Sequence, residues 1–262
     1  MKHNNTSQKQ EHYWLLTEKY NGVATPEYYN DVVRLESGMP VDFLIGYREF
    51  LNCPIDLSYR PLIPRNETEF WTQDIITKYK KQKSSTSQAV RVLDICAGSG
   101  CIGIALLAHL PKIQVDFAEY NPQFIKQIHK NLELNKIDPE RYHIYQSDMF
   151  TQVRGSSHPL YDLIVANPPY IARNRKDTVQ QSVHHFEDHG SLYADDDGLE
   201  YIKVIISALP RYLAPGGECY IEYDSWQTHL ITTYLDTYHP TLRYRILQDQ
   251  NEKDRVVHIY YK

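Results

Sequence analysis

The chain has 262 residues, 42% of them hydrophobic and 23% charged, which suits one soluble domain or a domain with a small appendage. Its formal net charge of −5 disfavours an extended nucleic-acid surface, so we expect no stable nucleic-acid complex. No apolar run reaches membrane-spanning length, and the start, MKHNNTSQKQEHYW, is too polar for a signal peptide. We therefore expect a cytoplasmic protein with no membrane partner.

The first part of the chain predicts short helices followed by a ribbon. Helical patterns over 12–20 and 26–36 would form a small helical unit. The stretch IGYREFLNCPIDLSYRPLIP alternates in polarity and is interrupted by prolines, which indicates a hairpin or short ribbon. The next stretch, ETEFWTQDIITKYKK, has its apolar residues at helical spacing.

From residue 90 onwards, strand and helix patterns alternate. Strands are expected at 90–96, 113–120, 141–147, 161–167, 216–224, 244–248 and 254–262. Helices are expected at 99–110, 121–135, 199–213 and 226–238, the second with Asn121 as N-cap and Pro122 at its first position. This alternation predicts an α/β fold with a mostly parallel, doubly wound sheet. The final two strands, joined by a short loop, must be antiparallel.

A glycine-rich turn joins the first of these strands to its helix. Gly98, Gly100 and Gly103 match the spacing G-x-G-x-x-G, and Glu119 ends the next strand about 20 residues on. The glycines let the backbone approach a ligand, and Glu119 can accept hydrogen bonds from ribose hydroxyls. The alternative is a tight turn beside an unrelated acid. Both features in one βαβ unit favour a nucleotide site.

Two further carboxylates bear on which nucleotide is bound. Asp94 lies at the end of the first strand, and Asp148 follows the third. Together with Glu119 they would repel a pyrophosphate but suit a cationic sulfonium and an α-amino group. This favours S-adenosylmethionine over NAD as the cofactor. Either Asp could instead cap a helix or close a turn.

The fourth strand ends unusually, in LIVANPPYIA. Pro168 and Pro169 prevent both further pairing and a helix start, so the backbone must leave the sheet rigidly. This presents Asn167 and Tyr170 at the carboxyl end of a parallel strand, where ligands bind in open α/β sheets. The alternative is a proline-rich loop that merely stops the strand.

Combined with the glycine loop, the sequence NPPY resembles that of class I methyltransferases that methylate planar amino groups. The Asn167 side-chain oxygen and the Pro168 carbonyl could accept both N–H bonds of such a group, while Tyr170 stacks on its plane. This would direct the nitrogen lone pair at the methyl group, which is catalysis by orientation without a strong base. Adenine, guanine and glutamine all carry a planar NH₂, so this loop does not choose among them.

The stretches on either side of this loop favour one of these three substrates. They are similar to signatures of the protein-(glutamine-N5) methyltransferases that act on peptide chain release factors, the HemK/PrmC family. The stretches are RPLIPRNETEFW (60–71), FEDHGSLYADDDGLEYIK (186–203) and LPRYLAPGGECYIEYD (209–224). The resemblance covers the chain from about Asp42 to its end. The alternative is an RNA or DNA methyltransferase that acts on the amino group of adenine or guanine. A basic groove or an RNA-binding appendage would favour this alternative.

The resemblance implies a class I S-adenosylmethionine-dependent methyltransferase fold, with a seven-stranded sheet whose last strand is antiparallel. It implies a helical N-terminal domain for release-factor recognition (1–44), a β-hairpin linker (45–68) and a catalytic domain (69–262). The implied cofactor residues are Asp94, Cys96, Ala97, Gly98, Ser99, Gly100, Glu119, Asp148, Met149 and Asn167. Asn167, Pro168, Pro169 and Tyr170 would hold the glutamine of the release factor's Gly-Gly-Gln loop. The expected product is S-adenosylhomocysteine.

Some positions depart from the family pattern. Cys96 stands where the family often has Gly, and Met149 replaces a common aromatic residue beside the adenine. Cys96 and Cys219 lie in apolar strand patterns, which predicts small buried residues. No cysteine pair has Cys-x-x-Cys spacing, so no metal is expected.

Two polar clusters are read as connections. His184, His185 and His189, with Glu187 and Asp188, could suggest a metal cluster, but a polar, flexible loop is the better interpretation. The run from Asp195 to Gly198 predicts a turn and an N-cap for the helix that starts at Leu199.

Overall fold

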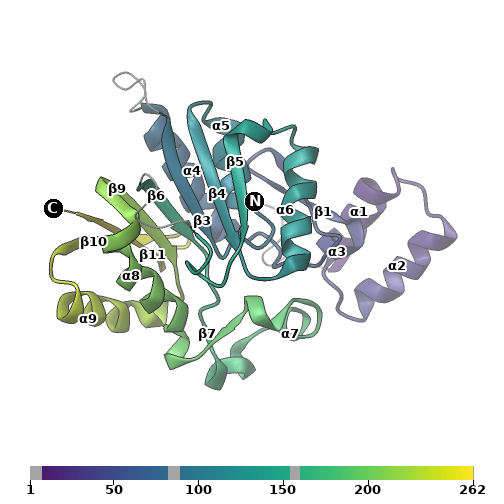
Figure 1. Cartoon of the computed structure of the whole chain (residues 1–262). Helices are drawn as coiled ribbons and strands as arrows, with labels where there is room; N and C mark the ends of the chain where they lie inside the picture. Colours follow the sequence, from purple (N-terminus) through teal and green to yellow (C-terminus); the bar gives the residue numbers. More distant parts are fainter. Residues whose placement is uncertain (1–7, 82–88, 154–159, 262) are drawn as a thin grey trace.

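The computed structural model of the chain describes residues 8–81, 89–153 and 160–261. Its centre is a seven-stranded sheet in the spatial order β10-β11-β9-β6-β3-β4-β5 (Figure 1). The strands are β3 (Val90–Ile95), β4 (Ile113–Glu119), β5 (Tyr142–Gln146), β6 (Tyr161–Ala166), β9 (Leu213–Glu222), β10 (Leu242–Gln248) and β11 (Asp254–Tyr261). Pairs from β5 to β9 are parallel, and β11 is antiparallel to both of its neighbours. The predicted α/β class and antiparallel last strand are confirmed.

Helices cover both faces of the sheet. Those on one face are α4 (Asn66–Lys81), α5 (Cys101–His109) and α6 (Pro122–Leu134), and those on the other are α8 (Glu200–Tyr212) and α9 (Thr228–Tyr238). Successive residues of a strand point to opposite faces, so Val92 joins the first core and Leu93 the second. Asn121 caps α6 as predicted, its side chain accepting a bond from the Gln123 N–H.

The N-terminal part begins with helices around a small core of their own. These are α1 (Gln8–Trp14), the π-helical turn η1 (Leu15–Lys19), α2 (Pro26–Glu36) and α3 (Val41–Ile45). Trp14 and Leu44 belong to this core. In Figure 1 the three α-helices lie beyond α6, at one side of the sheet. The boundaries at residues 44 and 68 stay predictions.

An antiparallel hairpin, β1 (Tyr47–Phe50) and β2 (Cys53–Asp56), follows these helices. It is joined to α6 by Asn131, whose Oδ1 accepts from the Asp56 N–H at 2.8 Å. The Nδ2 of the same side chain donates to the Ser99 carbonyl at 2.9 Å. One buried amide therefore connects the hairpin with the glycine-rich turn after β3.

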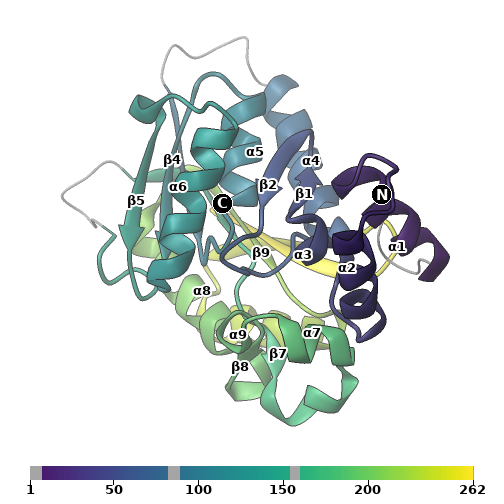
Figure 2. The same ribbon diagram turned by 90° about the vertical axis from the view of Figure 1, so that its right-hand side faces the viewer.

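Residues 171–198, here called the crossing segment, run past the carboxyl ends of the central strands (Figures 1 and 2). Its elements are β7 (Ile171–Ala172), η3 (Arg173–Thr178), α7 (Gln181–Phe186), η4 (His189–Ser191), β8 (Tyr193–Ala194) and η5 (Asp196–Gly198). Two single turns lie elsewhere, η2 (Pro139–Arg141) and η6 (Ser225–Gln227). The short strands β7 and β8 pair in parallel and close the segment on itself.

Two predictions for the crossing segment are wrong. The stretch around His184 is largely a helix, α7, and Glu187 is buried behind it because its carboxylate binds Arg65 from a distant part of the chain. The Asp195–Gly198 stretch does turn, as predicted. However, the N-cap residue of α8 is Leu199, which makes no side-chain cap, because Asp196 and Asp197 lie in η5 and Asp195 is the N-cap of η5.

None of the helices in the described ranges is long and apolar enough to span a membrane.

Candidate active site

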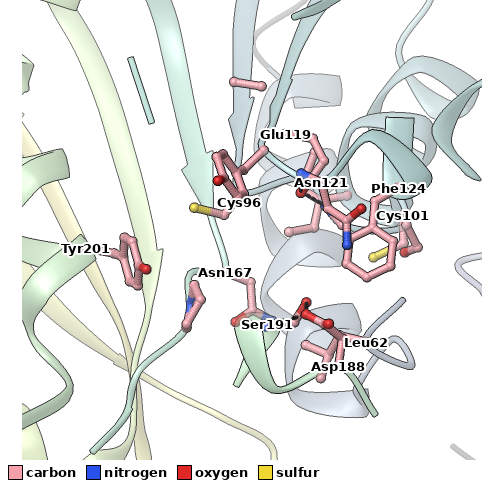
Figure 3. A pocket seen from close by; sticks show the side chains of 18 of the residues that line it. Leu62, Cys96, Cys101, Glu119, Asn121, Phe124, Asn167, Asp188, Ser191 and Tyr201 are labelled. Carbon is pink, nitrogen blue, oxygen red and sulfur yellow. Dashed lines mark hydrogen bonds between the residues drawn. The ribbon is translucent and has the colours of Figure 1, made fainter. Parts of the chain in front are cut away.

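A cavity of about 600 Å³ opens at the carboxyl ends of β3, β4 and β6, under the crossing segment. Figure 3 shows Glu119 and Asn121 on one side of it, Asn167 and Tyr201 on another, and Asp188, Ser191 and Leu62 across from Glu119. Eight of the ten predicted cofactor residues line it: Cys96, Ala97, Gly98, Ser99, Glu119, Asp148, Met149 and Asn167. The parallel sheet brings these residues together from separate strands.

The glycine-rich turn begins at the end of β3 and leads into α5. Gly98 and Gly100 have φ of 56° and 77°, the left-handed region that glycine adopts at little cost. Gly103 serves packing instead, because a Cβ there would approach the Phe117 ring to 2.3 Å. The turn can thus lie flat against β4 and expose its backbone to the cavity.

Glu119 holds this turn from the end of β4. Its Oε2 accepts from the Gly98 N–H and its Oε1 from the Asn121 N–H, both at 2.8 Å. Burial raises the pKa of the Glu119 carboxyl, and these backbone bonds oppose the rise. Each carboxylate oxygen can accept a second bond, so the group can still accept hydroxyls from the cavity.

Asp94 acts on the same turn from beneath. Its Oδ2 accepts from the Gly103 N–H at 2.9 Å, and neither Asp94 nor Gly100 lines the cavity. Burial raises the pKa of Asp94 to about 8. Its Oδ1 has no hydrogen-bond partner among the described residues. The alternative of an Asp that closes a turn therefore describes Asp94 better than a place on the cavity wall.

Cys96 corrects another expectation. It is half-buried and lines the cavity, whereas Cys219 is fully buried as predicted. Cys96 has a φ of 58° and Met149 a φ of 50°, and their sulfur atoms are 3.7 Å apart. The left-handed backbone explains why glycine would suit position 96. A strand pattern cannot reveal this, because the residue lies just beyond the strand.

The Asn167–Tyr170 loop is held firmly by its backbone. The Tyr170 carbonyl accepts from Gln227 Nε2 at 2.9 Å, and Gln227 is fully buried. A Cβ on Gly198 would come within 2.1 Å of the same carbonyl oxygen, so the crossing segment packs directly on the loop. The backbone of the loop is thereby fixed against Gln227 and the crossing segment.

The side chains of this loop bind a buried cluster behind it. Asn167 Nδ2 donates to Thr68 Oγ1 at 3.1 Å, and the Tyr170 hydroxyl donates to Glu222 Oε1 at 3.1 Å. Thr68 in turn donates to Glu222 Oε2 at 2.7 Å. The Asn167 Oδ1 atom is buried and has no partner among the described residues. The bond from Asn167 Nδ2 to Thr68 therefore orients the side chain, while its Oδ1 acceptor is left without a hydrogen bond.

A second cavity, of about 400 Å³, meets the first at Asn167. Pro168 and Tyr170 line it, while Asn167 lines both cavities. Arg175 lies over the Trp226 ring in its wall, with the guanidinium carbon 4.6 Å from the ring centre. The two cavities give the site two chambers that share one asparagine.

Arg65 also lines both chambers, and it is one of the residues that the prediction missed. Its Nη2 donates to both oxygens of the buried Glu187, at 2.7 and 2.8 Å. Glu187 accepts from the Ile63 N–H as well. The other missed residues are Thr68, Asp188, Ser191, Tyr201 and Glu222. Several lie inside the stretches that carry the family resemblance, which was the available signal.

No group of three or more His, Cys, Asp or Glu side chains in the described ranges is arranged to hold a metal ion. In the crossing segment the His184 and His189 rings stack, with centroids 4.7 Å apart. His184 Nδ1 also lies 2.9 Å from the Tyr193 hydroxyl. These histidines pack on each other and on their own segment.

Comparison with known proteins adds sequence relatives. Residues 74–198 match the family model of the methyltransferase small domain. The chain is 31% identical to the release factor glutamine methyltransferase of Geobacter sulfurreducens, over 86% of this chain and 75% of the relative. It is also 31% identical to the enzyme of that name from Streptococcus pneumoniae, over 86% and 76%. For the Francisella tularensis enzyme the identity is 32%, over 86% and 75%.

Solved structures share the fold at lower identity. The hMettl16 catalytic domain in complex with a MAT2A 3′UTR hairpin superposes with a TM-score of 0.63 at 16% identity, covering 96% of this chain and 91% of that one. A human methyltransferase 10 domain containing protein gives a TM-score of 0.57 at 19% identity, covering 91% and 99%. These structures bear on the fold alone.

Proposed function

This chain belongs to the family of release factor glutamine methyltransferases, and we propose that its two chambers hold S-adenosylmethionine and the glutamine of a release factor on either side of Asn167. The protein is an S-adenosylmethionine-dependent methyltransferase that methylates a release factor glutamine. The proposal concerns which residues do this. The substrate residue would be the glutamine of the Gly-Gly-Gln loop.

The first chamber fits the cofactor. Glu119 keeps free lone pairs toward the cavity for the ribose hydroxyls, while its bonds to Gly98 and Asn121 hold it in place. Asp148 lines the same chamber, and with Glu119 it supplies the negative charge that suits a sulfonium and an α-amino group. Cys96, Ala97, Ser99 and Met149 would complete the contacts. When bound, S-adenosylmethionine supplies an electrophilic methyl group.

The observation that carries the proposal is the unpartnered Asn167 Oδ1. A buried acceptor without a donor is unfavourable unless a ligand supplies one. A primary amide carries two N–H donors, and the Asn167 oxygen and the Pro168 carbonyl would accept one each. Holding both donors keeps electron density on the amide nitrogen and directs its lone pair toward the first chamber.

No strong base is needed in this arrangement. Nitrogen gains a bond to the methyl carbon as the carbon–sulfur bond breaks, and the product amide briefly carries an extra proton. A protonated amide nitrogen is strongly acidic, so the proton passes to water. The task of the protein is to position the amide and stabilise its developing charge.

The second chamber would admit the glutamine side chain. Pro168 and Tyr170 line it together with Asn167, so an amide entering there arrives beside both acceptors. The Tyr170 hydroxyl is bound to Glu222, which leaves its ring to contact the substrate. We assign recognition of the release factor body to the helices before residue 45, which lie beyond α6 at one side of the sheet in Figure 1.

The proposal is tested by methyl transfer from labelled S-adenosylmethionine to purified release factor, with tRNA, rRNA and DNA in parallel. Mass mapping should place the label on the glutamine of the Gly-Gly-Gln loop, and replacing that residue by asparagine should abolish labelling. Transfer to a nucleic acid in preference to the release factor would reject the proposal in favour of a nucleobase substrate.

A further inference from the structure

Behind the Asn167–Tyr170 loop lies a buried carboxylate that the reaction itself does not use. Glu222, at the end of β9, is 1% exposed. Its Oε2 accepts from Thr68 Oγ1 at 2.7 Å and from Trp71 Nε1 at 2.8 Å, both on α4. Its Oε1 accepts from the Tyr170 hydroxyl at 3.1 Å. Three donors converge on one carboxylate.

The donors determine how the hydrogen bonds run. An indole N–H can only donate, so Trp71 requires an acceptor at Oε2. Burial raises the pKa of the Glu222 carboxyl, and the hydrogen bonds from Thr68, Trp71 and Tyr170 oppose the rise. In its ionised state the carboxylate only accepts, so Thr68 donates its single hydroxyl proton to Glu222. Thr68 can then only accept from Asn167, and the group of Asn167 that faces it must be the NH₂. The amide oxygen and nitrogen of Asn167 have similar shapes, so shape alone does not show which one faces Thr68. The donors and acceptors around Thr68 do show it.

We propose that Thr68, anchored by Glu222, is a positioning residue that fixes the side-chain amide of Asn167 with its oxygen toward the substrate. The inference rests on the proposed role of Asn167 Oδ1 as the acceptor for the glutamine amide. Glu222 holds both functional side chains of the loop, Tyr170 directly and Asn167 through Thr68. Thr68 and Glu222 thus hold the NH₂ of Asn167 toward α4 and leave its Oδ1 without a partner among the described residues.

Without the Thr68 hydroxyl, no other described residue is bonded to the Asn167 amide so as to distinguish its two ends. A rotation of the amide by half a turn would then present NH₂ to the NH₂ of the substrate, and two donors cannot bond. The cofactor contacts on Glu119 and the glycine-rich turn do not involve this amide. Loss of the hydroxyl should therefore slow methyl transfer more than it weakens cofactor binding.

The test compares three variants of the full-length protein. Thr68→Val removes the hydroxyl and keeps the shape, and Thr68→Ser restores a hydroxyl. Thr72→Val removes a buried hydroxyl one turn along α4, where it donates only to the Thr68 backbone carbonyl at 2.7 Å. Thr72 thus controls for the general cost of a buried Thr→Val change in this helix.

We expect Thr68→Val to lower the single-turnover rate on release factor about tenfold or more, the equivalent of one lost orienting hydrogen bond. Thr68→Ser should recover most of the rate, and Thr72→Val should keep it. The dissociation constant for S-adenosylmethionine, measured by calorimetry, should change less than threefold in all three variants. A Thr68→Val rate within twofold of wild type, or an equal loss in Thr72→Val, would overturn the proposal.

A second readout needs no methyl transfer. In protein labelled with ¹⁵N at asparagine side chains, the Asn167 NH₂ should exchange slowly with water because it is bonded to Thr68. Thr68→Val should speed this exchange at least tenfold, and Thr68→Ser should not. If wild-type protein fails to methylate release factor, the proposed function fails while this measurement still decides the orientation. Unchanged exchange in Thr68→Val overturns the positioning role.

Discussion

The two ends of the site are built in different ways. At the end that we propose holds the cofactor, carboxylates bind backbone N–H groups nearby in the chain: Asp94 and Gly103 are 9 residues apart, and Glu119 and Gly98 are 21 apart. At the amide end, side chains bind side chains, and Thr68 lies 99 residues from Asn167 and 154 from Glu222. A local unit forms the first end, while the second exists only when distant segments meet.

This difference should separate binding from chemistry. Backbone contacts survive most side-chain substitutions. Cofactor binding should therefore depend on Glu119 and tolerate most other substitutions at that end. Contacts made by side chains can be removed one at a time, so the amide end should lose turnover while the cofactor still binds. Three substitutions, in order of expected effect, test this contrast.

The largest effect is expected for Asn167→Ala. It removes the acceptor for one substrate N–H, and losing one preorganised contact of this type typically costs about 10²–10³ in kcat. Binding of S-adenosylmethionine should fall far less, because Glu119 and the glycine-rich turn remain. Single-turnover rates at saturating release factor, with calorimetry for the cofactor, measure both quantities.

Asn174→Ala provides the control for that experiment. Asn174 is exposed, lies on the crossing segment and lines neither cavity. Its rate should match wild type. Asn167→Asp should bind the cofactor at least comparably yet transfer methyl slowly, because its charge stabilises the sulfonium more than the charge-dispersed transition state. If Asn167→Ala turned over near the wild-type rate, the loop would serve only to end β6.

The next effect is expected for Glu119→Ala, at the opposite end. Losing a charge-assisted pair of hydrogen bonds to the ribose should weaken S-adenosylmethionine binding by about 1.5–3 kcal/mol, or roughly 10–150-fold. Calorimetric titration measures this. Glu133→Ala, on the exposed side of α6, is the matched control. Unchanged affinity for S-adenosylmethionine would show that Glu119 does not bind the cofactor. It would also contradict the proposed difference between the two ends of the site.

The smallest effect is expected for Asp94→Asn. This variant tests whether the buried Asp94 carboxyl beneath the glycine-rich turn makes stability depend on pH. The folded-state pKa of Asp94 is about 8, above the ordinary 3.8, because the carboxyl is buried. The folded protein therefore holds this proton more tightly than the unfolded chain, and its stability falls as pH rises from about 4 to 8. Asparagine keeps an acceptor for the Gly103 N–H but cannot ionise.

Urea unfolding at pH 6 and pH 8.5 measures the effect of Asp94→Asn. The free energy of unfolding of wild type should fall more between these two values than that of the variant. Parallel pH profiles for the two proteins would mean that Asp94 is ionised at both pH values, contrary to its burial. Cofactor affinity at pH 6 should remain close to wild type, since Asp94 does not line the cavity.

The sequence predicted the local structure around the glycine-rich turn well because its signals are local. The α6 start at Asn121 and Pro122 and the turn between β3 and α5 depend on neighbours within a few residues. The errors arose where a side chain had partners elsewhere. Glu187 looked like part of a polar loop, but it is buried against Arg65, which lies 122 residues away.

By itself, the sequence determined the alternation of strands and helices, the glycine turn with Glu119 and the rigid exit of the chain at Asn167. These follow from hydrophobic period, backbone freedom and proline geometry, which act over a few residues. Only the tertiary structure decided that Asp94 lies beneath the turn and that Thr68 and Glu222 orient Asn167. Hydrogen-bond direction depends on which donors share one buried acceptor, and these donors meet only after α4, β6 and β9 have packed together.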